Sequence, residues 1–220
     1  MFNVEDAQVK LLHYTPLDVA LEAALVCTSS DDQLENYKGK RDEFLLNLLG
    51  QGHESVFEHI VYTFRIENIT RALLQELARH RHISLSVKST RYTLRKEALK
   101  NKFALNFKTP IFMAYFSKQQ EAYKQLLNAL DEMEKTIINA INVGIKNDVV
   151  KYFVPEALTT KLIMTVNLRE LRHILALRTG HNVLEEFRWL CFELYKALPE
   201  DHKFLFSDIA KIFNSKDFGK

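Results

Sequence analysis

One segment of the sequence, residues 79–92 (RHRHISLSVKSTRY), is crowded with side chains that donate hydrogen bonds. No acidic residue occurs between Glu76 and Glu97, so no charge within this basic window balances its cations. The cations are Arg79, Arg81, Lys88, Arg91, Arg95 and Lys96, and the hydroxyls are Ser84, Ser86, Ser89 and Thr90. Arginine presents a planar fork of donors to phosphate or carboxylate, and short hydroxyl side chains complete such a cradle. The segment is therefore predicted to bind an anion.

Two less specific interpretations of the basic window stay open: a solvated loop, and a patch for non-specific nucleic-acid binding. The formal net charge of the whole chain is only +2, so its basic character is local. Nucleic-acid-binding domains usually carry a basic stripe and a higher overall charge. Composition therefore weakens a nucleic-acid role, which would predict an affinity that falls steeply with salt.

A second segment, residues 165–189 (TVNLRELRHILALRTGHNVLEEFRW), places an arginine where a helix should be apolar. Residues 168–178 have helical spacing, and Arg178 projects from the middle of their apolar face in the last turn. An arginine is seldom buried without a partner. Arg178 therefore either caps the helix C-terminus, where cations are favoured, or meets an anion or carbonyl of a ligand. Arg169 and His173 lie four residues apart on another face, so they could share one ligand.

Metal and thiol chemistry are the other possibilities that the residue types raise. Residues 53–59 read HESVFEH, but the spacing of His53 and His59 matches no common zinc motif, so we predict no metal site. Cys27 and Cys191 lie far apart in apolar surroundings, which indicates neither a disulfide framework nor a metal site. Neither cysteine has a basic neighbourhood that would activate it as a nucleophile.

The elements that must position these residues follow from hydrophobic periodicity. Thr15 is predicted to cap the first helix with Pro16 in its first position, and Gly39 marks a weak point in the second. The expected strands are residues 9–14 and 57–66, the latter with Ile60, Tyr62, Phe64 and Ile66 on one face. The expected helices are residues 17–27, 33–49, 70–79, 117–146 (opened by the capping box Ser117-x-x-Gln120), 168–178, 184–198 and 207–214.

Length and hydrophobic runs predict a single cytoplasmic domain. At 220 residues with 47% hydrophobic content, the chain suits one domain spanning residues 1–220, and it contains no repeat or linker. The first ten residues include no apolar signal region. No apolar run approaches the length needed to cross a membrane, so no membrane segment is expected.

The order of residues in the basic window resembles the signature of a known family. Flavin-dependent thymidylate synthases, also called thymidylate synthase-complementing proteins, carry RHRxxS followed after four residues by SxR, often with Tyr next. The same order occurs here as Arg79-His80-Arg81, Ser84 and Ser89-x-Arg91-Tyr92. Residues 52–59 are similar to the family's GHxSxxEH, and residues 165–178 are similar to its TxNxRxxxxFxxLR. The similar blocks follow one another across about residues 30–187.

This resemblance implies an α+β fold with a small antiparallel sheet packed with long helices, and a homotetramer whose active sites are shared between subunits. The implied reaction is the reductive methylation of dUMP at C5 to dTMP. Methylenetetrahydrofolate would give the methylene group, and FAD reduced by NADPH would give the hydride. Arg178 would be the catalytic residue, because it would lie under the pyrimidine and stabilise negative charge there.

The resemblance also assigns residues to each ligand, with Glu76 on the nucleotide sugar and Arg79 on its phosphate. The implied dUMP residues are Glu76, Arg79, Ser89, Thr90, Arg91, Lys151 and Arg178, where Lys151 replaces the usual Arg. The implied FAD residues are Ser30, Ser55, Arg79, His80, Arg81, Val87, Asn167, Arg169 and His173. His53 and Glu58 would line the flavin and folate side.

Departures from the family pattern motivate one more alternative. Ser86 and His173 stand where many members carry Asn. Residues 181–187 read HNVLEEF in place of a stretch like HAQWEI, whose His usually contacts the flavin. A catalytically inactive relative that binds flavin or nucleotide would bind FAD and form no product.

Overall fold

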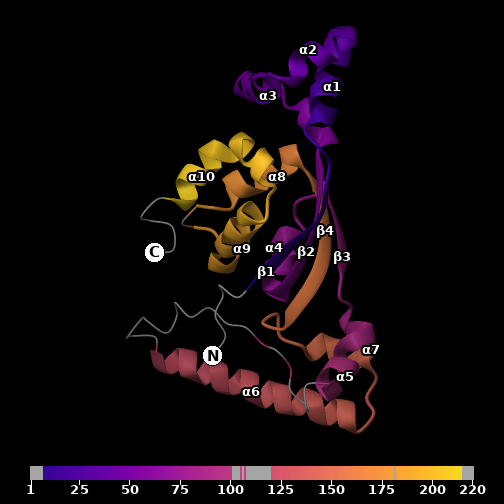
Figure 1. The fold of residues 1–220 in the computed structure, drawn as a ribbon. Coiled ribbons are helices and arrows are strands. Elements are labelled where there is room, and N and C mark those ends of the chain that lie inside the picture. The colour runs from indigo at the N-terminus through magenta and orange to yellow at the C-terminus, as the bar shows by residue number, and fades with distance from the viewer. Residues whose placement is uncertain (1–6, 101–104, 106, 108–119, 181, 215–220) are drawn as a thin grey trace.

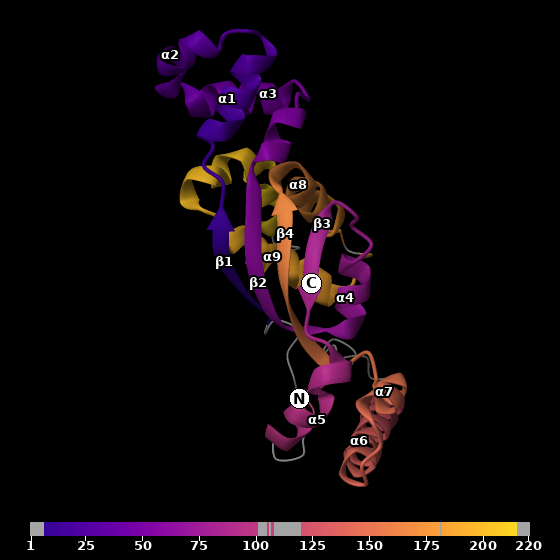
Figure 2. The same cartoon turned by 90° about the vertical axis from the view of Figure 1, so that its right-hand side faces the viewer.

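The computed structural model describes residues 7–100, 105, 107, 120–180 and 182–214. Its centre is a 4-stranded antiparallel sheet with the strand order β1-β2-β4-β3 (Figure 1, Figure 2). The strands are β1 (Gln8–Tyr14), β2 (Val61–Thr70), β3 (Ile83–Val87) and β4 (Thr159–Asn167). Most of the other elements are helices, so the expected α+β class is confirmed.

Helices lie beyond both ends of the sheet and on one of its faces. The α-helices are α1 (Asp18–Cys27), α2 (Leu34–Lys38), α3 (Arg41–Gly50), α4 (Arg71–Leu77), α5 (Thr90–Lys100), α6 (Gln120–Asn142), α7 (Asn147–Val150), α8 (Leu168–Leu177), α9 (Glu185–Lys196) and α10 (Ser207–Phe213). Short 3-10 helices are η2 (Asp31–Gln33), η3 (Ser55–His59), η5 (Lys151–Phe153) and η6 (Glu200–Phe206). Figure 1 shows α1 to α3 beyond one end, α5 to α7 beyond the other, and α8 to α10 against one face.

β2 is one of the two inner strands of the sheet, and it corresponds to the strand predicted over residues 57–66, although its bounds differ. The side chains predicted to share its buried face are all fully buried: Ile60, Tyr62, Phe64 and Ile66. The strand begins at Val61 because residues 55–59 form the 3-10 helix η3. It continues to Thr70 through an irregularity at Asn68, whose φ of 61° is in the left-handed region that asparagine tolerates.

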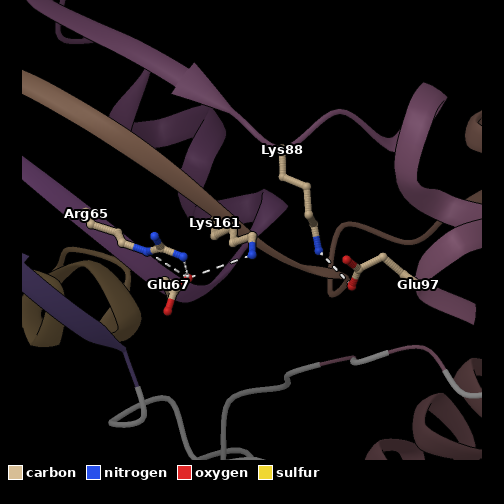
Figure 3. Close-up of polar contacts among 5 residues, drawn as sticks. All are labelled: Arg65, Glu67, Lys88, Glu97 and Lys161. Atoms are coloured by element: carbon tan, nitrogen blue, oxygen red, sulfur yellow. Dashed lines mark hydrogen bonds and ion pairs between the residues drawn. The ribbon is translucent and has the colours of Figure 1, made fainter. Parts of the chain in front are cut away.

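No described helix covers the opposite face of the sheet (Figure 2). Exposed polar residues of this face include Arg65, Ser84, Ser86 and Lys161. Figure 3 shows Arg65 and Lys161, from adjacent strands, converging on Glu67. Arg65 Nη2 lies 2.8 Å from Glu67 Oε1, and this hydrogen bond lowers the pKa of the Glu67 carboxyl. These charges are therefore paired with one another.

Predictions about the first helices have mixed outcomes. The single helix predicted over residues 33–49 is wrong, because the chain forms two helices, α2 and α3, which separate at the weak point predicted at Gly39. The predicted cap is wrong: Thr15 and Pro16 precede a helix that begins at Asp18, whose N-cap makes no side-chain hydrogen bond. The Thr15 hydroxyl instead accepts a hydrogen bond from the Val61 N–H at 3.2 Å, and its own N–H donates to the Val61 carbonyl. Thr15 therefore extends the pairing of β1 with β2.

A second hydrophobic core forms where α6 packs with α5 and α7. Its buried residues are Leu94, Ala98, Leu105, Phe107, Ile137, Ile138, Ile141, Val150 and Leu158. α6 ends at Asn142, before the predicted residue 146, because Gly144 turns the chain with a φ of 91°. The predicted capping box at Ser117 lies outside the described residues. This core holds the start of α5 close to η5, which carries Lys151.

Candidate active site

Arg178 is the central side chain of the candidate site. It follows α8 directly, and its Nη1 donates to Glu76 Oε2 while its Nε donates to His80 Nε2, both at 3.1 Å. The guanidinium lies over the Phe187 ring, 4.9 Å from its centroid, which explains an arginine on an apolar face. The sequence left open a helix cap or a ligand contact. In the described part of the structure this side chain contacts neither helix carbonyls nor solvent alone. It donates to His80 of the basic window and to Glu76, which bounds that window.

Side-chain caps fix where the two short helices that converge on Arg178 begin. Asn167 caps α8, because its Oδ1 accepts the Glu170 N–H at 2.8 Å. Thr70 caps α4 in the same way by accepting the Leu73 N–H, and α4 then carries Glu76 in its last turn. Both helices start at the end of a strand, so the sheet fixes where Glu76 and Arg178 meet.

His80 is buried, and both of its ring nitrogens have partners. Its Nε2 accepts from Arg178, and its Nδ1 lies 3.3 Å from Glu170 Oε1. A guanidinium only donates, so Nε2 carries no proton and Nδ1 donates to Glu170. Burial lowers the pKa of His80, the charge of Arg178 lowers it further, and Glu170 opposes both effects. The neutral ring is therefore the form that this site holds.

An open cleft of about 590 Å³ lies beside this network, within the size range of ligand pockets. Its lining residues are Glu54, Glu58, His82, Asn167, Arg169, Glu170, Arg172, His173 and Ala176. Three of the residues implied to contact flavin therefore share one cleft, namely Asn167, Arg169 and His173. Glu58, implied for the flavin and folate side, is there too, and η3 supplies it.

Arg169 reaches across the cleft to two carboxylates. Its Nη1 donates to Glu58 Oε1 at 2.6 Å and its Nε donates to Glu54 Oε2 at 3.2 Å. The hydrogen bond to Glu58 raises the pKa of this exposed guanidinium. A ligand anion that reaches Arg169 must compete with both carboxylates. Glu54 and Glu170 were not among the predicted site residues, and no motif letter in the sequence marks them.

The sequence suggested that no acidic residue balances the cations of the basic window, and the structure corrects this expectation. Lys88 pairs with Glu97 (Figure 3), with 3.3 Å between Nζ and Oε2, and Arg91 Nε lies 2.8 Å from Asp148 Oδ1. The acids come from α5 and α7, outside the window, so the fold supplies the missing charge. Arg79 is exposed and forms no ion pair with any residue that the structure describes.

The residues implied to bind dUMP fall into two groups within one chain. Glu76, Arg79 and Arg178 belong to the helical face of the sheet, around α4 and α8. The other group is Ser89, Thr90, Arg91 and Lys151, at the end of the sheet that carries α5 to α7 (Figure 1). Arg91 lines a separate pocket of about 410 Å³ between α5 and α7. A single chain therefore does not bring the two groups together.

The remaining implied residues lie on other segments. Val87 ends β3, and Ser55 opens η3 shortly after His53. Ser30 follows α1, and its hydroxyl donates to the Thr28 carbonyl at 3.3 Å. Arg81 is exposed at the turn before β3. His181, whose surroundings depart from the family pattern, lies outside the described residues.

The buried thiol near the site is not a nucleophile. Cys191 Sγ lies 4.0 Å from the Arg178 carbonyl, and burial raises the pKa of this thiol. It therefore stays protonated, as the apolar surroundings of Cys191 in the sequence indicated. Within the described residues, no cluster of three or more His, Cys, Asp and Glu side chains is arranged to hold a metal ion. None of the described helices has the length and apolar character needed to cross a membrane.

The structure is an α+β protein with a small antiparallel sheet and a charged cleft beside the paired Arg178. Residues 10–202 match the family model described as thymidylate synthase complementing protein, and the chain belongs to that family. The resemblance seen in the sequence is thereby confirmed.

Relatives and solved structures agree with this membership over most of the chain. The flavin-dependent thymidylate synthase of Campylobacter jejuni (strain RM1221) is 37% identical over 202 residues, covering 90% of this chain and 95% of that protein. The Pyrococcus furiosus protein of the same name is 29% identical over 200 residues, covering 88% of this chain and 79% of that protein. A crystal structure of thymidylate synthase X from Helicobacter pylori with FAD and dUMP has a TM-score of 0.77 and 32% identity, covering 93% of this chain and 99% of that chain.

Proposed function

We propose that this protein is an FAD-dependent thymidylate synthase that converts dUMP to dTMP. Methylenetetrahydrofolate supplies the carbon, NADPH supplies the reducing equivalents, and tetrahydrofolate and NADP⁺ are the other products. The observation that carries the proposal is the convergence of Glu76, His80 and Arg178 beside a cleft that contains Asn167 and Arg169. These residues come from separate family motifs, and the fold brings them together.

The cleft suits a flavin nucleotide in its donor chemistry. Arg169 offers a cation to its phosphates in competition with Glu54 and Glu58, and His82 and His173 offer ring nitrogens and flat surfaces. FAD, when bound, supplies the hydride chemistry that amino-acid side chains cannot perform. The protein's part is to bind, orient and polarise the reactants.

Arg178 would stabilise negative charge that develops on the uracil ring. Its contacts to Glu76 and His80 fix the guanidinium before the substrate arrives, so little reorganisation is needed during the reaction. The Glu76 side chain is 38% exposed and offers a second carboxylate oxygen to a sugar hydroxyl. Arg79, Ser89, Thr90 and Arg91 would hold the phosphate, with Lys151 assisting.

A homotetramer with shared active sites would unite the two groups of dUMP residues. Because one chain holds Arg178 and Arg91 in separate pockets, a neighbouring subunit would bring its α5–α7 group to the first subunit's Arg178. Exposed aromatic side chains beside that group support an interface, among them Tyr92 at 74%, Tyr152 at 80% and Phe153 at 62% exposure. A single domain and a cytoplasmic location remain predictions.

The test is release of tritium from C5-labelled dUMP, with FAD, NADPH and methylenetetrahydrofolate omitted one at a time. We expect release that requires the folate, together with dTMP formation and NADPH oxidation. A folded protein that binds FAD but releases no tritium would instead be the inactive relative. A folded protein that binds neither FAD nor dUMP, and binds nucleic acid in a salt-dependent way, would favour the nucleic-acid alternative.

A further inference from the structure

Glu170 is a partly buried carboxylate whose position the site described so far does not explain. It lies in the first turn of α8, where an acidic residue is favoured by the helix dipole. The dipole alone would leave the side chain in water, yet its exposure is only 12%. The carboxylate turns inward, and Oε1 lies 3.3 Å from His80 Nδ1. Its backbone N–H is already held by Asn167, so the helix cap does not depend on the carboxylate.

The contact between His80 and Arg178 allows only one protonation state of the imidazole. Arg178 Nε donates to His80 Nε2, so a proton on Nε2 would set two donors against each other. A doubly protonated ring would add a second cation beside the guanidinium. The remaining state carries its proton on Nδ1, and Glu170 is the acceptor placed to receive that hydrogen bond.

The groups that face His80 from other elements either favour its Nδ1-protonated tautomer or do not bias the tautomer. His173, on α8, stands edge-on with 6.1 Å between ring centroids, and Phe187, on α9, stands edge-on at 6.0 Å. Arg178 is the facing cation and Glu170 the facing anion, while Glu76 faces the ring only through Arg178. Glu170 is therefore the carboxylate that directly biases the His80 tautomer.

We propose that Glu170 is a positioning residue for thymidylate synthesis: it fixes the Nδ1-protonated tautomer of His80, which in turn orients the Arg178 guanidinium toward the substrate ring. The proposal rests on the function proposed above. Without Glu170, His80 can move its proton to Nε2, and Arg178 then loses one of its two side-chain acceptors. The guanidinium would remain tied to Glu76 alone and would turn away from its working position.

The kinetic test compares Glu170→Ala and Glu170→Gln with wild-type holoenzyme. Loss of a supporting hydrogen-bond partner typically lowers activity about 10- to 100-fold, so we expect kcat of Glu170→Ala to fall by roughly that factor. The KM for dUMP should change less, because Arg178 acts on developing charge. Glu170→Gln should recover much of kcat, because its amide oxygen can accept from Nδ1–H. If Glu170→Ala fails to fold, the Gln variant and the tautomer measurement still test the proposal.

Asp208→Asn is the matched control. Asp208 also pairs with a residue of α8, with Oδ2 2.8 Å from Arg172 Nη2, but it does not contact His80 or Arg178. This variant should keep kcat close to that of the wild type. A fall in kcat as large as that of Glu170→Ala would mean that loss of any carboxylate on α8, or paired with α8 as Asp208 of α10 is, has this effect, and the proposal would be overturned.

The second readout is the ¹⁵N NMR spectrum of histidine-labelled holoenzyme, with His80 assigned by the signal lost in His80→Gln. Wild-type His80 should show a protonated Nδ1 and a bare Nε2, and Glu170→Ala should move protonation toward Nε2. An unchanged tautomer would overturn the proposal even if activity falls. The proposal would also be overturned if Glu170→Ala kept wild-type kcat while Arg178→Ala was inactive. That result would leave the proposed function intact. Absence of dTMP formation by the wild type would instead overturn the proposed function, and the tautomer would still report on Glu170.

Discussion

Replacing Arg178 by alanine should nearly abolish dTMP formation while leaving the protein folded and yellow with bound FAD. The guanidinium is held by Glu76 and His80 and is 17% exposed, so it is a preorganised donor in a partly desolvated position. Removal of one such donor typically lowers kcat about a hundred- to a thousand-fold. This corresponds to roughly 3–4 kcal/mol of lost transition-state stabilisation.

The same substitution should lower the free energy of unfolding, but by less than the total stability of a typical domain. His80 Nε2 would be left without its donor, which costs about 1–3 kcal/mol for a buried polar atom. Loss of the guanidinium from the Phe187 ring would add about 0.5–2 kcal/mol. A typical domain has about 5–15 kcal/mol of stability, so the variant should remain folded.

The assay is tritium release at saturating folate and NADPH, with flavin absorbance per subunit measured on the same preparation. Arg65→Ala is the control, because Arg65 is an ion-paired arginine on the opposite face of the sheet. It should keep full turnover. Normal turnover in Arg178→Ala would remove Arg178 from the mechanism, and an unfolded Arg178→Ala would assign the side chain to the core.

Three further substitutions test other parts of the structure. Glu54→Gln removes one carboxylate that competes for Arg169, so FAD should bind a few-fold more tightly in a fluorescence titration, and weaker binding would contradict this view. His202 is fully buried with Nδ1 2.8 Å from Tyr62 Oη, and burial lowers its pKa. The unfolded chain therefore binds more protons below about pH 6.5, so the free energy of unfolding should fall from pH 7 to pH 5, and His202→Gln should flatten that slope in denaturant melts. Thr70→Val should lower stability by more than the about 1 kcal/mol of a lost α4 cap, because the Thr70 hydroxyl also donates to the buried Glu186 carboxylate, and an unchanged melting temperature would contradict both contacts.

The sequence predicted elements whose signal is local and repeated. The alternation from Ile60 to Ile66 identified the buried face of β2, and the spacing of residues 168–178 identified α8, because burial imposes those periods directly. β3 and β4 were missed. β3 is only five residues long, with serines on its outer face. β4 lies in the middle of the sheet through its pairing with β2 and β3, which are distant in the sequence.

The candidate site was predictable only where family motifs mark it. Arg178 drew attention because a cation stood on an apolar face, and the structure shows why that position is satisfied. Glu54, Asp148 and Glu170 act through contacts with residues 57 to 115 positions away, so no local pattern reveals them. The same reason explains the wrong expectation of an unbalanced basic window.

The site residues lie in two separate regions of the folded subunit, and this separation has a genetic consequence. In the proposed homotetramer, Arg178→Ala and Arg91→Ala each damage a different half of every shared site. A mixed tetramer contains sites built from the intact Arg178 half of one subunit and the intact Arg91 half of the other. Co-expression of the two defective alleles should therefore restore thymidine-independent growth that neither allele supports alone.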